Sequence, residues 1–228
     1  MEEITKKVNK NYLVKILILS VVIFFIVFGS LRLYRIIKVD RSTYTFDGAT
    51  GQFTFNIVEN NKLKQHVVSV YVFEDDGKEH EKVIPLRYGP KEMKDITVEK
   101  DIDNLVLLDL SKEDTLKDLI YITQDPKLVE ESNRDSIVAS LEIMKVVGDY
   151  SFGVYKIPMQ MAYTAKGSTN LPIITCKDTE SSKGVIFLKY GNGNRIYSEE
   201  GCVILEATTS EGLIKVADRL VLDLLGVF

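Results

Sequence analysis

The chain has 228 residues, of which 45% are hydrophobic and 27% are charged. Its charge is uneven, because residues 1–41 hold 8 of the 29 Lys and Arg residues but only 3 of the 33 Asp and Glu residues. Residues 42–228 therefore carry 21 basic and 30 acidic residues, a net charge of about −9. An acidic region of this kind is a poor ligand for nucleic acid or anionic lipid, so we predict no nucleic-acid partner.

The first expected element is an apolar run, Ile16–Leu31, which lies between Lys15 and Arg32. With its flanking residues, the run is long enough for one helix to cross a hydrocarbon core of about 30 Å. The pattern predicts a transmembrane signal-anchor helix over residues 12–35, preceded by a short cytoplasmic tail over residues 1–11. The lipid bilayer is then a partner of the chain through Ile16–Leu31.

Two other interpretations of this run are less favoured. A buried helix of a soluble protein would need a polar face, and only Ser20, Gly29 and Ser30 interrupt the run. A cleaved secretory signal has an apolar core of about 7–15 residues that ends in a small-x-small site. The run is longer than that, and its nearest candidate site begins with the bulky Phe28.

The charges that flank the run do not set its orientation, because four Lys residues precede it and four basic residues follow it before residue 42. However, the segment before the run is short, and the large region after it is acidic. Both features favour a single-pass protein of the cell membrane, with the amino terminus in the cytoplasm and the C-terminal domain outside.

The two cysteines, Cys176 and Cys202, both lie in the region expected outside the cytoplasm. An even number of cysteines in an oxidising compartment predicts a disulfide bond between them. Closing a loop of this length stabilises a folded domain by roughly 3 kcal/mol in the chain-entropy model. Two unrelated buried thiols are the alternative. A structural zinc site is disfavoured, because two cysteines without a nearby His cannot supply four ligands.

Residues 36–125 show β patterning after a short juxtamembrane stretch. Alternating apolar residues and Asp-Gly turns predict two hairpins, and Pro85 predicts that the last of their four strands is an edge strand or ends there. Residues 111–118 are acidic and compatible with a helix. The strands expected in this region are Thr43–Phe46, Gln52–Val58, Val67–Phe73, His80–Leu86, Asn104–Leu110 and Leu119–Thr123.

The C-terminal part of the chain mixes helices and strands. Apolar residues at helical spacing predict a helix over Ser132–Val147, with Leu141 on its buried face. A second helix closes the chain after Thr208–Glu211, which has capping-box spacing, and Asp218 would lie on its polar side. Gly191–Asn194 predicts a hairpin turn with positive φ. The strands expected are Gly153–Ile157, Met159–Thr164, Pro172–Cys176, Gly184–Tyr190, Arg195–Ser198 and Gly201–Glu206.

Together these elements predict an α+β fold, with an N-terminal transmembrane helix followed by a mostly antiparallel β-sheet region and two packed helices. Residues 36–125 would form a β-rich extracytoplasmic region, and residues 126–228 an α+β C-terminal region that contains the disulfide. The two regions could form one domain or two packed halves, with any boundary near Pro126.

Motifs of known chemistry are absent from the sequence. It has no G-x-S-x-G, H-E-x-x-H or Walker A motif, and its only two histidines, His66 and His80, are expected on solvated strand faces. We therefore predict no catalytic residues, no metal ligands and no cofactor. The acidic candidates are interpreted as solvated turns: Glu74–Asp76, Glu130–Glu131 and Glu199–Glu200. Arg87-Tyr88 is interpreted as a structural pair, with a ligand contact as the alternative.

Six segments after the apolar run form a further pattern: Ile84–Met93, Tyr121–Pro126, Leu171–Cys176, Val185–Lys189, Cys202–Leu205 and Ala217–Val227. Together they resemble a group of uncharacterised archaeal proteins with a single membrane-spanning anchor. The C-terminal pair of cysteines and the final helix are the most specific parts of the resemblance. Proteins of this group carry no assigned activity, so the resemblance implies location and a coherent fold but no functional residue.

The sequence favours a non-catalytic binding or assembly module of the cell envelope, an anchored extracytoplasmic domain that binds another envelope protein. The alternative is an anchored extracytoplasmic hydrolase or a small-ligand sensor, so an enzymatic role stays open although it is less favoured. An enzyme or sensor needs a cleft where several polar groups converge. An interaction module needs only an exposed apolar patch or a free sheet edge.

Overall fold

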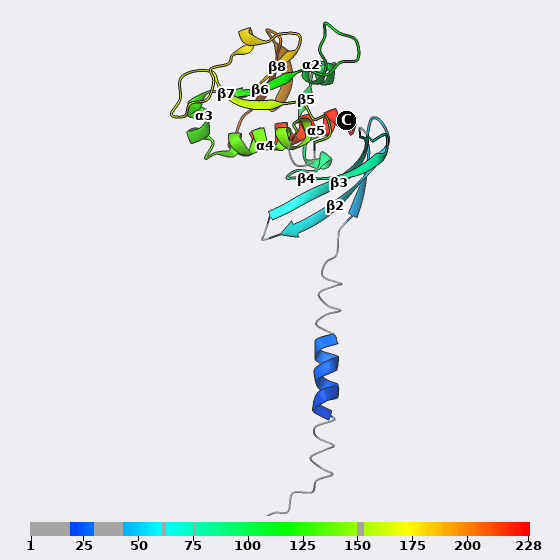
Figure 1. Ribbon diagram of the computed structural model, residues 1–228. Coiled ribbons are helices and arrows are strands. Elements are labelled where there is room, and N and C mark those ends of the chain that lie inside the picture. The colour runs from blue at the N-terminus through cyan, green and yellow to red at the C-terminus, as the bar shows by residue number, and fades with distance from the viewer. Residues whose placement is uncertain (1–18, 30–42, 61–62, 75, 150–152) are drawn as a thin grey trace, which may run out of the picture. The chain divides into compact units, whose positions relative to one another are not determined.

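The computed structural model describes residues 19–29, 43–60, 63–74, 76–149 and 153–228. The chain separates into two units, Met1–Ser42 and Thr43–Phe228. The second unit is compact and contains two β-sheets with the helices that connect and cover them (Figure 1).

The first sheet is an antiparallel meander of four strands in the order β1-β2-β3-β4. Its strands are β1 (Thr43–Asp47), β2 (Gln52–Asn60), β3 (Leu63–Phe73) and β4 (Glu79–Leu86). Both predicted hairpins are confirmed, and Pro85 lies in the edge strand β4, a position where proline is tolerated. One face of the sheet packs into the core through residues such as Phe55, Val68 and Ile84, none more than 1% exposed.

The second sheet has six strands in the order β5-β9-β10-β8-β6-β7. Strands β7, β6, β8 and β10 run parallel to one another, and β9 is antiparallel to β10. The predicted mostly antiparallel sheet is therefore wrong for this part of the fold, because apolar periodicity locates strands but does not identify their neighbours. The strands are β5 (Thr97–Val98), β6 (Leu119–Gln124), β7 (Met159–Tyr163), β8 (Lys183–Tyr190), β9 (Arg195–Glu199) and β10 (Cys202–Ala207).

The two longest helices of this unit, α4 and α5, pack on each other and on one face of the second sheet. That face carries Ile122, Leu188 and Leu205, all 0% exposed. The connection from β6 to β7 runs through α3 and α4, as parallel neighbours require. The helices are α2 (Ile102–Leu107), α3 (Pro126–Glu131), α4 (Asp135–Val147) and α5 (Ser210–Leu224), with 3-10 turns η1 (Pro90–Glu92) and η2 (Cys176–Asp178).

Helix α5 begins after Thr209, whose hydroxyl accepts a hydrogen bond from the Gly212 N–H at 3.0 Å. The prediction that Asp218 lies on a polar side of this helix is wrong, because Asp218 is 0% exposed. Helix α5 contacts the second sheet, α4 and the segment that follows β4, so it is covered on more sides than a surface helix.

Two other secondary-structure predictions are corrected. Most of the expected strand Asn104–Leu110 belongs to helix α2, and Gly153–Ile157 is not a strand. A short apolar run suits both a strand and a turn of buried helix, so its composition does not decide between them. In α4, Ala139 and Ile143 are buried whereas Leu141 is 53% exposed, so the buried face is rotated from the predicted one.

The predicted hairpin turn at Gly191–Asn194 is also wrong, because β10 lies between β8 and β9. The segment crosses from β8 to β9, and neither Gly191 nor Gly193 has positive φ. Gly191 is required for space, since a Cβ there would lie 2.1 Å from the Glu206 side chain. The tight turn is Glu200–Gly201, between β9 and β10, where both residues have positive φ.

The structure corrects the transmembrane helix predicted over residues 12–35. The helix described there covers only residues 19–29, and its 11 residues span about half of a 30 Å hydrocarbon core. Among the described residues, none of the helices combines the length and the apolar composition that crossing a bilayer requires. Residues 12–18 and 30–35 lie outside the described residues.

The predicted disulfide is confirmed. Cys176 in η2 is bonded to Cys202 at the start of β10, with Cα atoms 5.1 Å apart. The bond ties the segment before β8 to the face of the second sheet opposite α4 and α5, where Val185, Cys202 and Ile204 form a small separate core. The α+β class of the fold is also confirmed.

Candidate functional site

The first sheet has a second face that carries exposed apolar side chains. Because side chains alternate along a strand, the residues next to Phe55, Val68 and Ile84 point away from the core. We call these outward-pointing residues of β1 to β4 the outer face. Its exposed large apolar members are Val58 (38%), Leu63 (41%), Tyr71 (64%), Phe73 (79%) and Val83 (46%).

Strand register divides these side chains between two ends of the outer face. Val58 and Leu63 lie near the β2–β3 hairpin, whereas Tyr71, Phe73 and Val83 lie toward the other end of β3 and form an apolar patch there. Val83 of β4 lies opposite Ser69, which stands between Val67 and Tyr71 on β3. Val58 of β2 lies opposite Gln65, which is two residues before Val67 on β3. Single exposed apolar residues are normal on a protein surface, whereas several on one face mark an interaction surface.

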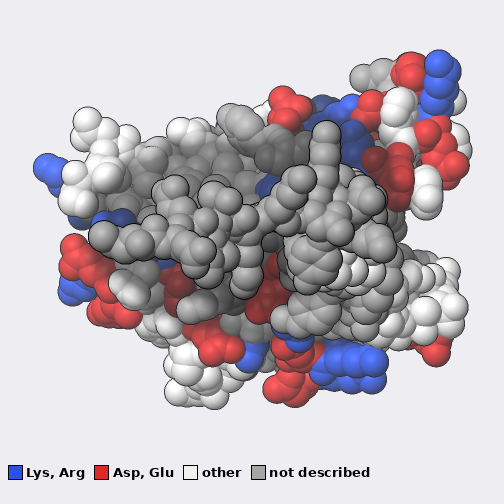
Figure 2. All heavy atoms as spheres, turned by 90° about the horizontal axis from the view of Figure 1, so that it is seen from below, with Lys and Arg blue, Asp and Glu red and all other residues white. Residues whose placement is uncertain are grey.

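The described charged residues of the outer face are all acidic, namely Asp47, Glu79 and Glu81. Lys82 has the opposite alternation and pairs with Glu74 at 2.6 Å. Within the described part of the chain, neither Glu79 nor Glu81 has a side-chain hydrogen bond or an ion pair. Figure 2 shows the described acidic and basic residues in small interspersed groups, without a broad basic area.

A hollow of about 610 Å³ opens beside this apolar patch. The pairing of β2 with β3 starts at Phe55 and Val68 and runs only toward their hairpin turn. Beyond that point β1 stays paired with β2 and β4 with β3, so the two pairs of strands diverge. The hollow lies in the gap, and its lining includes Gln52, Thr54, Asn56, Ser69, Tyr71 and Glu81.

A signal for the outer face is present in the sequence of β3. Val67–Phe73 is apolar at six of its seven positions, so both alternating sets of side chains are apolar. A strand with one buried face usually alternates apolar with polar residues, and a strand that is apolar on both faces needs a cover for each. The sequence predicts this strand, but it does not show what covers the second set of apolar side chains.

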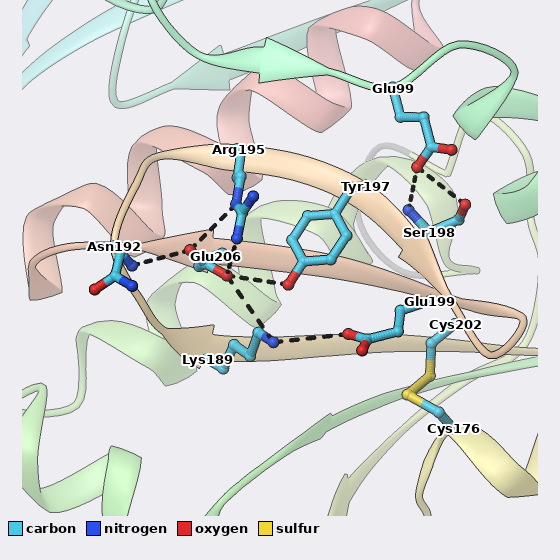
Figure 3. A network of polar contacts seen from close by, with 10 residues as sticks. All are labelled: Glu99, Cys176, Lys189, Asn192, Arg195, Tyr197, Ser198, Glu199, Cys202 and Glu206. Carbon is cyan, nitrogen blue, oxygen red and sulfur yellow. Dashed lines mark hydrogen bonds and ion pairs between the residues drawn. A yellow bond between two sulfur atoms is a disulfide. The ribbon is translucent and has the colours of Figure 1, made fainter.

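A polar network occupies the other sheet, on the face that also carries the disulfide (Figure 3). Its centre is Glu206 of β10, whose side chain is 4% exposed. The carboxylate accepts hydrogen bonds from Arg195 Nη2, Tyr197 Oη and the Asn192 backbone N–H, each at 3.0 Å. Three segments that meet at the crossover from β8 to β9 are thereby held together.

The charges of this network compensate one another. Burial opposes ionisation of Glu206, but the hydrogen bonds from Arg195, Tyr197 and Asn192 outweigh it and hold the pKa of the carboxyl below its usual value. Lys189 Nζ lies 3.9 Å from Glu206 and 3.8 Å from Glu199. Two carboxylates thus meet two cations, which supports a structural role.

His66 is 4% exposed, so its predicted position on a solvated face is wrong. Its Nδ1 is hydrogen-bonded to Tyr44 Oη at 2.8 Å, and its Nε2 lies 3.0 Å from Glu92 Oε2 without hydrogen-bond geometry. Burial lowers the pKa of His66 and raises that of Tyr44 well above its usual value. The described lining of the hollow includes none of His66, Tyr44 and Glu92. Gly89 leaves space for this group, since a Cβ on Gly89 would lie 2.2 Å from Tyr44 Oη.

Helix α5 brings Asp218 to the segment Arg87-Tyr88, which was the predicted structural or ligand-contact pair. Asp218 Oδ2 accepts the Arg87 and Tyr88 backbone N–H groups at 3.0 and 2.9 Å, and none of the described N–H groups donates to Oδ1. Burial, followed by the charge of Glu142, raises the pKa of Asp218 well above its usual value, although Lys145 opposes this. The Arg87-Tyr88 pair therefore serves the packing of α5.

The remaining predicted candidates stay apart from one another. His80 lies 3.2 Å from Asp76 at an exposed hairpin end, as expected for a solvated residue. The pairs Glu130–Glu131 and Glu199–Glu200 lie in exposed positions on different elements. Across the described residues, no cluster of three or more His, Cys, Asp or Glu side chains could hold a metal ion.

The fold and these sites define an α+β domain with one disulfide and an exposed, apolar and acidic sheet face. No family model, curated protein or solved structure matches the chain. The resemblance to uncharacterised archaeal membrane-anchored proteins therefore stays a prediction.

Proposed function

We propose that this protein is a non-catalytic binding module of the cell envelope, which docks a partner protein on the outer face of its first sheet. The observation that carries the proposal is the gathering of five large apolar side chains, between 38% and 79% exposed, on that single face. Water contact with such a patch is costly, and a partner that covers it recovers about 25 cal/mol per Å² of apolar area.

A binding role is also supported by where the titratable groups lie. His66, Glu206 and Asp218 are each buried and engaged with neighbouring groups of the fold. Among the described residues that line the hollow there is one carboxylate and no His, Cys, Lys or Arg. General acid–base or nucleophilic chemistry needs such groups within reach of a bound substrate.

The partner should present apolar residues bordered by Lys or Arg. The outer face contributes Asp47, Glu79 and Glu81 and no described basic residue, so a basic rim on the partner would complete the ion pairs. A second copy of this chain is a poorer partner, because a symmetric contact would bring these acidic residues together.

We place the module outside the cytoplasm and at the membrane. Disulfides such as Cys176–Cys202 persist in oxidising compartments. The apolar segment Ile16–Leu31 supports contact with a lipid bilayer, and the short basic segment before it supports a cytoplasmic amino terminus. Such a module would bind another envelope protein.

Site-specific photo-cross-linking in cells that make the full chain tests the proposal. A photoreactive phenylalanine is placed at Phe73 or Val83 on the outer face, or at Leu110 as control. Leu110 is 65% exposed but lies outside the outer face. We expect the same cross-linked protein from Phe73 and Val83 and none from Leu110. A Glu79→Lys substitution should reduce the yield at Phe73 about tenfold, because it repels a basic partner.

Three outcomes would overturn the proposal. Cross-linking that is equally strong from Leu110 would mean that exposure alone explains it. A product of twice the mass of the chain would assign the outer face to self-association. An absence of any product at both outer-face positions would mean that no partner covers the patch.

A further inference from the structure

The hollow between the diverging strands differs chemically from the apolar patch beside it. Its floor includes Phe53, Val70 and Leu225, and its walls carry hydroxyl and carboxamide groups. Glu81 is the one charged residue of the lining. At about 610 Å³ the hollow lies within the range of small-ligand sites, roughly 300–1,000 Å³.

Glu81 carries an uncompensated charge at this hollow. Among the described residues its carboxylate has no ion pair. By contrast, Glu74, which directly follows β3, is paired with Lys82 at 2.6 Å. The lining adds acceptor oxygens from Asn56 and Ser69, and Tyr71 contributes a ring that is 64% exposed. These groups suit a cation that donates several hydrogen bonds.

We propose that the hollow binds the guanidinium group of an arginine side chain from the partner, with Glu81 as its counterion. This inference rests on the proposed function, because it assigns one anchoring residue to the partner that covers the outer face. Buried arginines are frequent anchors at protein interfaces.

An arginine fits this lining better than a lysine does. A guanidinium is planar, donates five N–H groups in a fixed fork and stacks on aromatic rings such as that of Tyr71. Its aliphatic stem can pack on an apolar floor while the head reaches the carboxylate of Glu81. An ammonium is a compact and strongly hydrated point charge, so it would leave the aromatic and carboxamide groups of the walls less engaged.

The test uses the isotope-labelled full chain in mild detergent, with N-acetylarginine amide as the probe and N-acetylcitrulline amide as its uncharged match. We expect the arginine probe to shift the backbone amide resonances of Thr54, Ser69 and Glu81 in a saturable manner. The citrulline probe should bind about tenfold more weakly, because it lacks the charge that Glu81 pairs with.

Two matched variants sharpen the result. Glu81→Gln should weaken arginine binding about tenfold, whereas Glu79→Gln should change it less than about twofold. Glu79 lies on the same strand and the same face but does not line the hollow. Equal binding of both probes, or equal effects of both variants, would overturn the inference. Stronger shifts with N-acetylglucosamine would instead assign the hollow to a neutral sugar.

Failure of this inference can be distinguished from failure of the proposed function. If Phe73 and Val83 cross-link one partner but the arginine probe does not bind, the outer face is a docking surface and only its anchor has been misassigned. If the probe binds but no partner cross-links, the hollow is a cation site of another kind, and the docking proposal fails.

Discussion

A carboxyl group without access to water, such as that of Asp218, links the stability of this protein to pH. Oδ2 accepts two backbone N–H groups, whereas Oδ1 accepts none from the described residues and Glu142 adds a negative charge nearby. Burial and that charge raise the pKa of Asp218 well above its usual value. The folded state therefore binds this proton more tightly than the unfolded chain, in which the pKa is about 3.9.

The sign of the effect follows from this difference. The contribution of Asp218 to stability is fully present below about pH 4, and it is lost as the pH rises through the raised pKa of the folded state. Asp218→Asn removes the titration and keeps a neutral side chain of the same shape. We expect the stability of this variant relative to the natural chain to increase as the pH rises above about 4.

Urea unfolding at several pH values measures this prediction. Asp95→Asn, at an exposed position, serves as the control for the loss of one carboxyl group. If the profile of Asp218→Asn ran parallel to that of the natural chain, Asp218 would be ionised in the folded state and the assignment of its proton would be wrong.

Individual residues also show where the sequence was informative. Spacing and compartment predicted the Cys176–Cys202 bond correctly, because two cysteines leave a single pairing. The polarity of Asp218 and His66 alone predicts solvated positions for both. Both are buried by elements that come from other parts of the chain, and local sequence does not contain that information.

At the scale of elements, the disulfide fastens the segment before β8 to the start of β10. The segment is also held by Thr123 Oγ1, which donates to the Ile174 carbonyl at 2.7 Å, and by the Ile174 N–H, which donates to the Tyr163 carbonyl at 2.8 Å. These hydrogen bonds do not restrict the unfolded chain, whereas the covalent bond does. Loss of the disulfide should therefore act mainly through the unfolded state.

The double variant Cys176→Ser, Cys202→Ser tests this expectation. The bond closes a loop with a sequence separation of 26, which corresponds to about 3 kcal/mol in the chain-entropy model. We expect urea unfolding to show a loss of about that size with the fold retained. The natural chain in the presence of a reductant is the matched control. A loss below about 1 kcal/mol would contradict an entropic role for this bond.

The strands and helices could be predicted where their patterns are long, and their neighbours could not. Strand β8 is a continuous apolar run, β2 alternates apolar with polar residues, and an Asp-Gly step marks the turn of each hairpin of the first sheet. By contrast, Gly191–Asn194 looks like a hairpin turn, and only the insertion of β10 between β8 and β9 shows otherwise. The pairing of β10 with β8 is a long-range contact, which a local turn signal cannot reveal.

At the scale of the whole molecule, composition and periodicity predicted an α+β fold but not the distribution of its exposed surface. The apolar character of Val67–Phe73 was visible, yet only the packing of the sheet decides which set of side chains stays outside. The outer face follows from three-dimensional arrangement, since Val58, Tyr71 and Val83 come from three different strands. The N-terminal helix that the structure describes, residues 19–29, is shorter than the predicted one.

The position of the whole chain relative to the membrane is the last prediction. If the domain lies outside the cytoplasm, its exposed lysines, such as Lys94, Lys100 and Lys177, should react in intact cells with a membrane-impermeant amine reagent. Lys6 and Lys7, before the apolar segment, should react only after lysis and so provide an internal control. Mass spectrometry of the unreduced protein would detect both the modified lysines and the Cys176–Cys202 bond. Protection of the domain lysines until lysis, together with free thiols in cells, would place the domain in the cytoplasm. The search for its partner would then have to move to that compartment.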